Sequence, residues 1–181
     1  KEIEKRTVYS IFSKPIGRGE FIVGKYIGLC STLLVNILVM GAGVSFALLY
    51  VGGGPLVWKI WGAVTLIFFE LTIITAVAIM FSSFSTPALS ALLTFFVFLI
   101  GHFSSSLLDL ATSLGSKGAI WFFSAIYYLL PNLSNFSFIA NTANGDVPPF
   151  AMVGGAIVYA VIFDVILMAI TVMIFSRRNF K

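Results

Sequence analysis

The sequence has 181 residues, of which 59% are hydrophobic and 10% charged, and its formal net charge is +4. A soluble domain carries about 25% charged residues, so this chain lacks the polar residues to cover a water-facing surface. The composition excludes a soluble globular protein and predicts an all-α integral membrane protein. The basic balance does not indicate nucleic-acid binding, because the basic residues flank apolar segments, where they set orientation and contact lipid headgroups.

Charge is concentrated at the two ends of the chain. Between Tyr26 and Phe150 only Lys59 and Lys117 are basic, whereas residues 1–25 and the tail 177–181 are rich in Lys and Arg. Lys and Arg near spans resist translocation, so we expect both ends in the cytoplasm, as in a multi-pass protein of a bacterial or archaeal plasma membrane. The chain starts at Lys1 without Met or signal peptide, and we therefore expect a preceding part of a longer protein.

The segment 1–25 predicts an interfacial structure before the first span. Over residues 2–13, apolar side chains at i, i+3 and i+4 indicate a short amphipathic helix on the membrane surface. Pro15 is expected to stop this helix. Gly17 and Gly19 then predict a tight turn around Arg18, with a new helix from Gly19 or Glu20.

The transmembrane domain, residues 26–176, is predicted to cross the bilayer four times. A span needs about 20 apolar residues. Segments of that length lie at about 26–50, 58–81, 88–108 and 150–175. Four crossings keep both termini on the cytoplasmic side.

Residues 109–149 are predicted to be external. Within them, 119–130 is apolar but too short to cross, and it predicts a re-entrant helix that dips into the outer leaflet or packs over the spans. Joined through Pro131 to residue 139, it would reach crossing length. That fifth span would place the basic tail outside, against the charge bias, and we therefore prefer four.

Glu70 and Asp164 lie near the middle of the second and fourth predicted spans, and His102 lies in the outer half of the third. Such groups are costly in a membrane and are candidates for a polar substrate path or a proton relay. The simpler explanation is a neutral carboxyl, hydrogen-bonded to a hydroxyl on a neighbouring helix, that fixes helix packing. Candidate partners are Thr65, Thr72, Thr75 and Thr171.

Other motifs are weak or missing. One His and two carboxylates on three helices form no recognised metal or catalytic set, and an intramembrane enzyme that uses His102 with Glu70 or Asp164 is a remote alternative. No GxxxxGK[ST] sequence occurs, so this chain holds no ATP by a P-loop. The GxxxG pair Gly24–Gly28 arises easily by chance among 16 glycines, and the external asparagines 132, 135, 141 and 144 suit turn backbone.

The opening segment resembles the cytoplasmic segment of permeases in the ABC type-two exporter family. The family pattern is like E-x-E-[KR]-x-T…S-K-P-[IV]-x-R-x-[EQ]-[FI]…G-K before a span. The matching residues are Glu2, Glu4, Lys5, Thr7, Ser13, Lys14, Pro15, Ile16, Arg18, Glu20, Phe21, Gly24 and Lys25. Gly17 departs from it, since Ser or Thr is expected there. The basic exit of the last span, 175–180, is also similar to that family's final helix.

The resemblance implies six spans per subunit, the first two of which would precede this chain. It implies that residues 1–25 form a coupling helix that docks on a separate ATPase subunit, with Glu4, Lys14, Pro15, Arg18 and Glu20 at the contact. A second permease subunit, identical or not, would complete the exporter. The chain itself would be no enzyme, because ATP and Mg would be bound by the ATPase partner. The alternative is a non-transporting membrane scaffold whose basic segment recruits cytoplasmic partners or anionic lipid.

Overall fold

The computed structural model describes residues 17–104, 106, 107, 109, 113 and 117–176. Within these residues all regular secondary structure is helical, as the composition predicted. The expected surface helix 2–13, with Glu4, Lys14 and Pro15, lies outside the described residues, and so does the tail 177–181. For Arg18 only the backbone is described.

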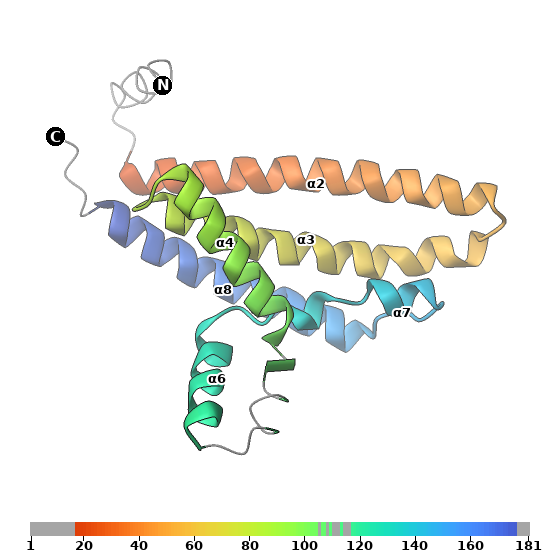
Figure 1. Ribbon diagram of the computed structural model, residues 1–181. Helices are drawn as coiled ribbons and strands as arrows, with labels where there is room; N and C mark the ends of the chain where they lie inside the picture. The colour runs from red at the N-terminus through yellow and green to blue at the C-terminus, as the bar shows by residue number, and fades with distance from the viewer. Residues whose placement is uncertain (1–16, 105, 108, 110–112, 114–116, 177–181) are drawn as a thin grey trace.

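Three helices are long and apolar enough to cross a membrane: α2 (Arg18–Tyr50), α3 (Gly54–Ser82) and α8 (Phe150–Ser176). They contain the first, second and fourth predicted spans. At 1.5 Å per residue, even the 27 residues of α8 extend about 40 Å, which exceeds a hydrocarbon core of about 30 Å. Figure 1 shows α2 and α3 as a long antiparallel hairpin, with the start of α2 and the end of α8 at the same end of the bundle.

The helix in the third predicted span is shorter than expected. The sequence predicted a span over 88–108, whereas α4 (Pro87–His102) has 16 residues and a length of about 24 Å. Pro87 occupies its first turn, where the missing N–H costs nothing. The Phe103 N–H bonds to the Leu99 carbonyl and closes the last turn. By length and composition α4 does not qualify as a crossing helix, so the four-span arrangement stays a prediction.

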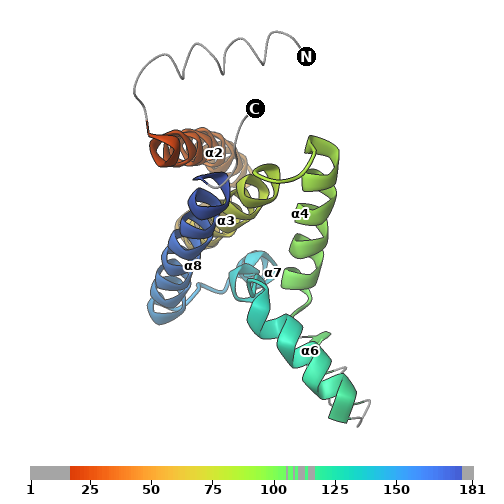
Figure 2. The ribbon, with the colours of Figure 1, turned by 90° about the vertical axis from the view of Figure 1, so that its left-hand side faces the viewer.

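The region between α4 and α8 contains short helices: α6 (Lys117–Leu129), η1 (Ser134–Phe136) and α7 (Ile139–Ala143). The apolar helix expected at 119–130 is thus present as α6. It ends before Pro131 and residues 130–133 are not helical, so no continuous helix covers 119–139. Figures 1 and 2 show α6 projecting away from the long helices. The Trp121 side chain on α6 is 75% exposed.

Helix α3 lies at the centre of the bundle and contacts α2, α4, α7, η1 and α8. Its buried residues Leu66, Ile73 and Ala76 belong to the main core cluster. Small residues on α8, Ala156 and Ala160, are buried in the same cluster and allow close helix approach. In contrast, α2 exposes apolar side chains over most of its length.

Candidate functional site

The first turn of α2 is capped by its own sequence. The Gly17 N–H donates to the Glu20 carboxylate (3.1 Å to Oε2), which satisfies a donor that a helix start leaves open. Arg18 and Gly19 already belong to α2, so the tight turn expected around Arg18 is absent. The Glu20 side chain therefore folds back to cap the start of α2 and does not extend freely from a turn around Arg18.

This helix start packs against the ends of α3 and α8. Ile22 is buried together with Ile79 of α3 and Met168 of α8. The Phe21 ring stacks on Phe175 with 6.3 Å between centroids. We call the contact of Phe21 and Ile22 with α3 and α8 the junction, and it joins three long helices at the end of the bundle where α2 starts and α8 ends.

Of the three predicted intramembrane ionisable residues, the structure brings two together. Glu70 on α3 and His102 on α4 approach to 3.7 Å between Oε1 and Nδ1, which is ion-pair range but too long for a hydrogen bond. The imidazole stacks on Phe98 and meets Phe103 edge-on. The pair lies where α4 ends, and no threonine hydroxyl is hydrogen-bonded to Glu70 in the described part of the chain.

Asp164 lies apart from that pair and faces α2 and α3. It is 8% exposed, and its Oδ1 has no hydrogen-bond partner. The Tyr26 and Thr72 hydroxyls lie near this carboxyl. Thr72 was one of four threonines predicted as partners. Its own hydrogen goes to the Phe69 carbonyl (2.8 Å), so towards Asp164 it can only accept.

The other three candidate threonines serve their own helices. Thr65, Thr75 and Thr171 donate to the carbonyls of Trp61, Leu71 and Leu167, each one turn earlier. Such bonds satisfy a hydroxyl inside a membrane without a partner helix. Sequence reasoning missed Tyr26 as a partner of Asp164, because Tyr26 was interpreted only as the first residue of a span.

A cluster of hydrogen-bonded polar groups that the sequence did not predict is centred on Asn132. Its Oδ1 accepts from the Ser104 hydroxyl (2.7 Å) and from Ser134, while its Nδ2 donates to the Tyr127 hydroxyl (3.0 Å). The Asn132 backbone N–H donates to the Tyr159 hydroxyl of α8. This hub links the chain after α4 to α6, η1 and α8. The only signal in the sequence was the turn-forming order Pro131-Asn132, which indicated a turn residue without its long-range partners.

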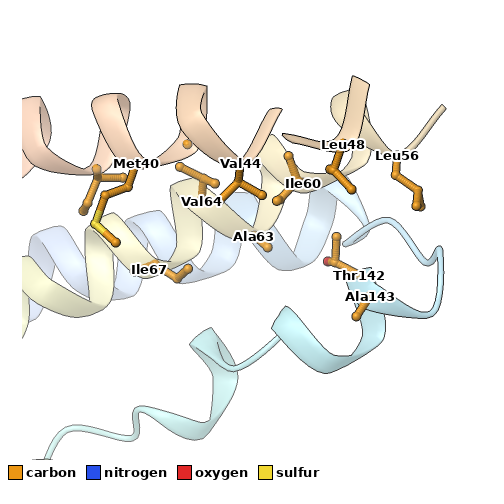
Figure 3. A pocket seen from close by; sticks show the side chains of 12 residues that line it. Met40, Val44, Leu48, Leu56, Ile60, Ala63, Val64, Ile67, Thr142 and Ala143 are labelled. Atoms are coloured by element: carbon orange, nitrogen blue, oxygen red, sulfur yellow. The ribbon is translucent and has the colours of Figure 1, made fainter. Parts of the chain in front are cut away.

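An apolar pocket of about 470 Å³ lies between α2, α3 and α7 (Figure 3). Helix α2 contributes side chains from Ile37 to Leu48, α3 those from Leu56 to Ile67, and α7 contributes Thr142 and Ala143. Thr142 is the one polar residue in the lining, and its hydroxyl already donates to the Phe138 carbonyl. The pocket therefore suits an apolar ligand.

A second groove, of about 560 Å³, lies between α2, α3 and α4 at the opposite end of the hairpin. Lys25 lies at this groove together with five hydroxyl side chains: Thr32, Thr75, Ser82, Ser90 and Thr94. Thr32, Thr75, Ser90 and Thr94 donate to backbone carbonyls, which leaves their oxygens as acceptors. This groove is the more polar of the two.

Comparison of the chain with protein-family models, with curated proteins and with solved structures finds no match. No group of three or more His, Cys, Asp or Glu side chains suited to a metal ion occurs among the described residues. The candidate site thus consists of the junction, the separate carboxyl groups of Glu70 and Asp164, the apolar pocket and the second groove.

Proposed function

We propose that this chain is the transmembrane permease subunit of an ATP-driven ABC exporter. The resemblance of residues 2–25 to the coupling segment of type-two permeases supports this, because those residues lead directly into α2. The observation that carries the proposal is the junction. A displacement of the segment before Gly17 would reach three long helices through the buried contact of Ile22 with Ile79 and Met168.

In this mechanism the energy comes from a partner. A separate ATPase subunit binds ATP and moves the coupling segment, and the helices change between two arrangements. A ligand shifts such an equilibrium only by its different affinity for the two states. The substrate would enter at the groove near Lys25, which opens at the same end as the junction and offers hydroxyl oxygens. A second permease subunit would complete the path.

The proposal includes four crossings with both termini in the cytoplasm. Helix α3 ends at the bundle end where α2 starts, and α8 starts at the other end (Figure 1), which supports a crossing by the chain between α3 and α8. In a Cys30→Ala background, Ser116→Cys and Asn144→Cys should react with an impermeant thiol reagent from outside. Thr86→Cys, in the turn before α4, should react only in opened cells. Equal labelling of Thr86→Cys in intact cells would contradict this topology.

The coupling proposal is tested by co-purification from native membranes in mild detergent. The expected partner is a protein with a GxxxxGK[ST] motif, identified by mass spectrometry of the purified complex. Arg18→Glu should reduce its recovery about tenfold or more, because arginines at the centre of an interface often carry much of the binding energy. Val8→Ala should leave recovery unchanged, since its face is expected to rest on lipid or on the spans.

One outcome would reject the exporter, and a second would reject the docking role of Arg18. If no P-loop protein is recovered with the unsubstituted chain, the scaffold alternative is favoured. Equal recovery of the ATPase with Arg18→Glu and with the unsubstituted chain, at equal membrane insertion, would mean that Arg18 is not at the docking surface.

A further inference from the structure

The apolar pocket between α2, α3 and α7 has the length of one leaflet of a bilayer. Its lining extends from Ile37 to Leu48 on α2 and from Leu56 to Ile67 on α3, eleven residue steps on each helix. At 1.5 Å per step this is about 16 Å, and half of a hydrocarbon core of about 30 Å is about 15 Å. The volume of about 470 Å³ lies within the usual range of ligand pockets, about 300–1,000 Å³.

The shallow end of the pocket lies at the level of lipid headgroups. Leu48 and Leu56 line it beside the α2–α3 turn, and Trp58 nearby is 84% exposed. Tryptophan favours the boundary between hydrocarbon and headgroups, which locates this turn at the membrane surface. The deep end, at Ile37 and Ile67, therefore reaches towards the bilayer centre.

A cation lies beside this shallow end. Lys59, between the lining residues Leu56 and Ile60, donates from Nζ to the Gly145 carbonyl at 2.6 Å. An ammonium group has three donors, and this bond uses one. In the described part of the chain no carboxylate lies within ion-pair distance of Lys59. The positive charge of Lys59 is therefore available to bind a ligand at the level of the lipid headgroups.

We propose that this pocket is a lipid-binding site that holds one acyl chain of an anionic phospholipid, with the headgroup phosphate at Lys59. The apolar lining replaces neighbouring lipid tails along the chain. Ala63, whose side chain is a single methyl group, lines the pocket between α2 and α3 (Figure 3). The proposal does not depend on the exporter function, since it needs only a bilayer around the helices.

The test uses the full chain in phosphatidylcholine nanodiscs that contain a small fraction of phosphatidylglycerol with a photoactivatable acyl chain. Labelled peptides should come from residues 37–48 and 56–67. Val44→Trp should fill the pocket from its exposed side and reduce this labelling about tenfold, a change of about 1.4 kcal/mol in binding. The matched control is Val39→Trp on the same helix, because Val39 is 67% exposed and does not line the pocket.

The charge is tested separately. Lys59→Gln keeps a hydrogen-bond donor at this position but removes the positive charge. Phosphatidylglycerol should label the unsubstituted chain more strongly than phosphatidylcholine with the same photoactivatable chain, and Lys59→Gln should abolish that preference. Lys117→Gln on α6 should keep it.

Three results would overturn the proposal. Equal loss of labelling in Val39→Trp and Val44→Trp would indicate ordinary surrounding lipid. Equal labelling by the two phospholipids in the unsubstituted chain would remove the role of Lys59. Disulfide crosslinking of two chains through Val44→Cys, with loss of lipid labelling in the dimer, would assign the pocket to a second copy of this chain.

Discussion

Glu70 on α3 and His102 on α4 face each other at 3.7 Å, and in the described part of the chain this is the one contact between two of Glu70, His102 and Asp164. The Glu70 side chain is 12% exposed and that of His102 is 35% exposed. His102 is the last residue of the short helix α4 and Glu70 lies near the middle of α3, so the pair connects the end of α4 to the middle of α3. We expect the pair to fix the rotation of α4 against the bundle.

A double-mutant cycle measures this coupling. Glu70→Gln and His102→Gln should each lower the free energy of unfolding in detergent, and the double variant should lose less than the sum by about 0.5–1 kcal/mol, as for residues in contact. The control combines Glu70→Gln with Lys117→Gln on the distant α6, which should be additive. An additive Glu70–His102 cycle would mean that the proximity contributes no stability.

Asp164 should tolerate an amide. Thr72 can only accept from it, because the Thr72 hydrogen is bound to Phe69. The Nδ2–H of asparagine can donate to Thr72 as a protonated acid would. The free energy of unfolding of Asp164→Asn should therefore lie within about 0.5 kcal/mol of that of the unsubstituted chain. Asp164→Ala should lose about 1–3 kcal/mol, because the Tyr26 hydroxyl loses its partner on α8.

The measurement is thermal unfolding of both Asp164 variants in the same detergent. A loss in Asp164→Asn as large as that in Asp164→Ala would indicate that the ionised carboxylate itself is required. Asp164 would then be promoted from a packing residue to a member of a polar path.

Asn132 should be the most sensitive asparagine of the region between α4 and α8. Its side chain is bonded to Ser104, Tyr127 and Ser134, so Asn132→Ala removes contacts to three segments at once. We expect a loss of about 2 kcal/mol in the free energy of unfolding. Asn135→Ala is the matched control, since Asn135 is exposed and should change stability by less than about 0.5 kcal/mol. Equal effects of the two substitutions would contradict the hub.

Gly101 is required by close packing. A Cβ there would lie 2.6 Å from the Pro131 carbonyl oxygen, and the Leu133 N–H bonds to the Gly101 carbonyl at 3.0 Å. Because the neighbour is backbone, Gly101→Ala should cost about 1–3 kcal/mol. Gly43→Ala on α2 has open space around it and should instead stabilise the helix by roughly 0.5–1 kcal/mol. Thermal unfolding of both variants tests the contrast, and a neutral Gly101→Ala would refute the close approach.

The GxxxG pair shows how spacing can be present without a contact. A Cβ at Gly24 or at Gly28 would meet no neighbouring atom within 4 Å, so no described helix of this chain packs closely there. The close helix–helix contacts instead involve Ala156 and Ala160 of α8, which lie in the core beside α3. Four-residue spacing of small residues brings helices together only when it faces the bundle.

The sequence alone was sufficient to locate the three long helices and the short apolar one. Hydropathy is a local property, and the ends of these helices are marked by local signals: glycines before Pro55, Pro87 at the start of α4, and Pro131 after α6. Only the tertiary structure decided which polar groups meet. Helices that are apolar on every side carry no periodicity that reveals their rotation, so neither the Glu70–His102 pair nor the Tyr26–Asp164 contact could be derived from spacing. The same reason explains why the partners of Asn132 could not be derived, since they lie on segments that packing brings together. It also explains the early end of α4, where Gly101 meets the 131–133 backbone.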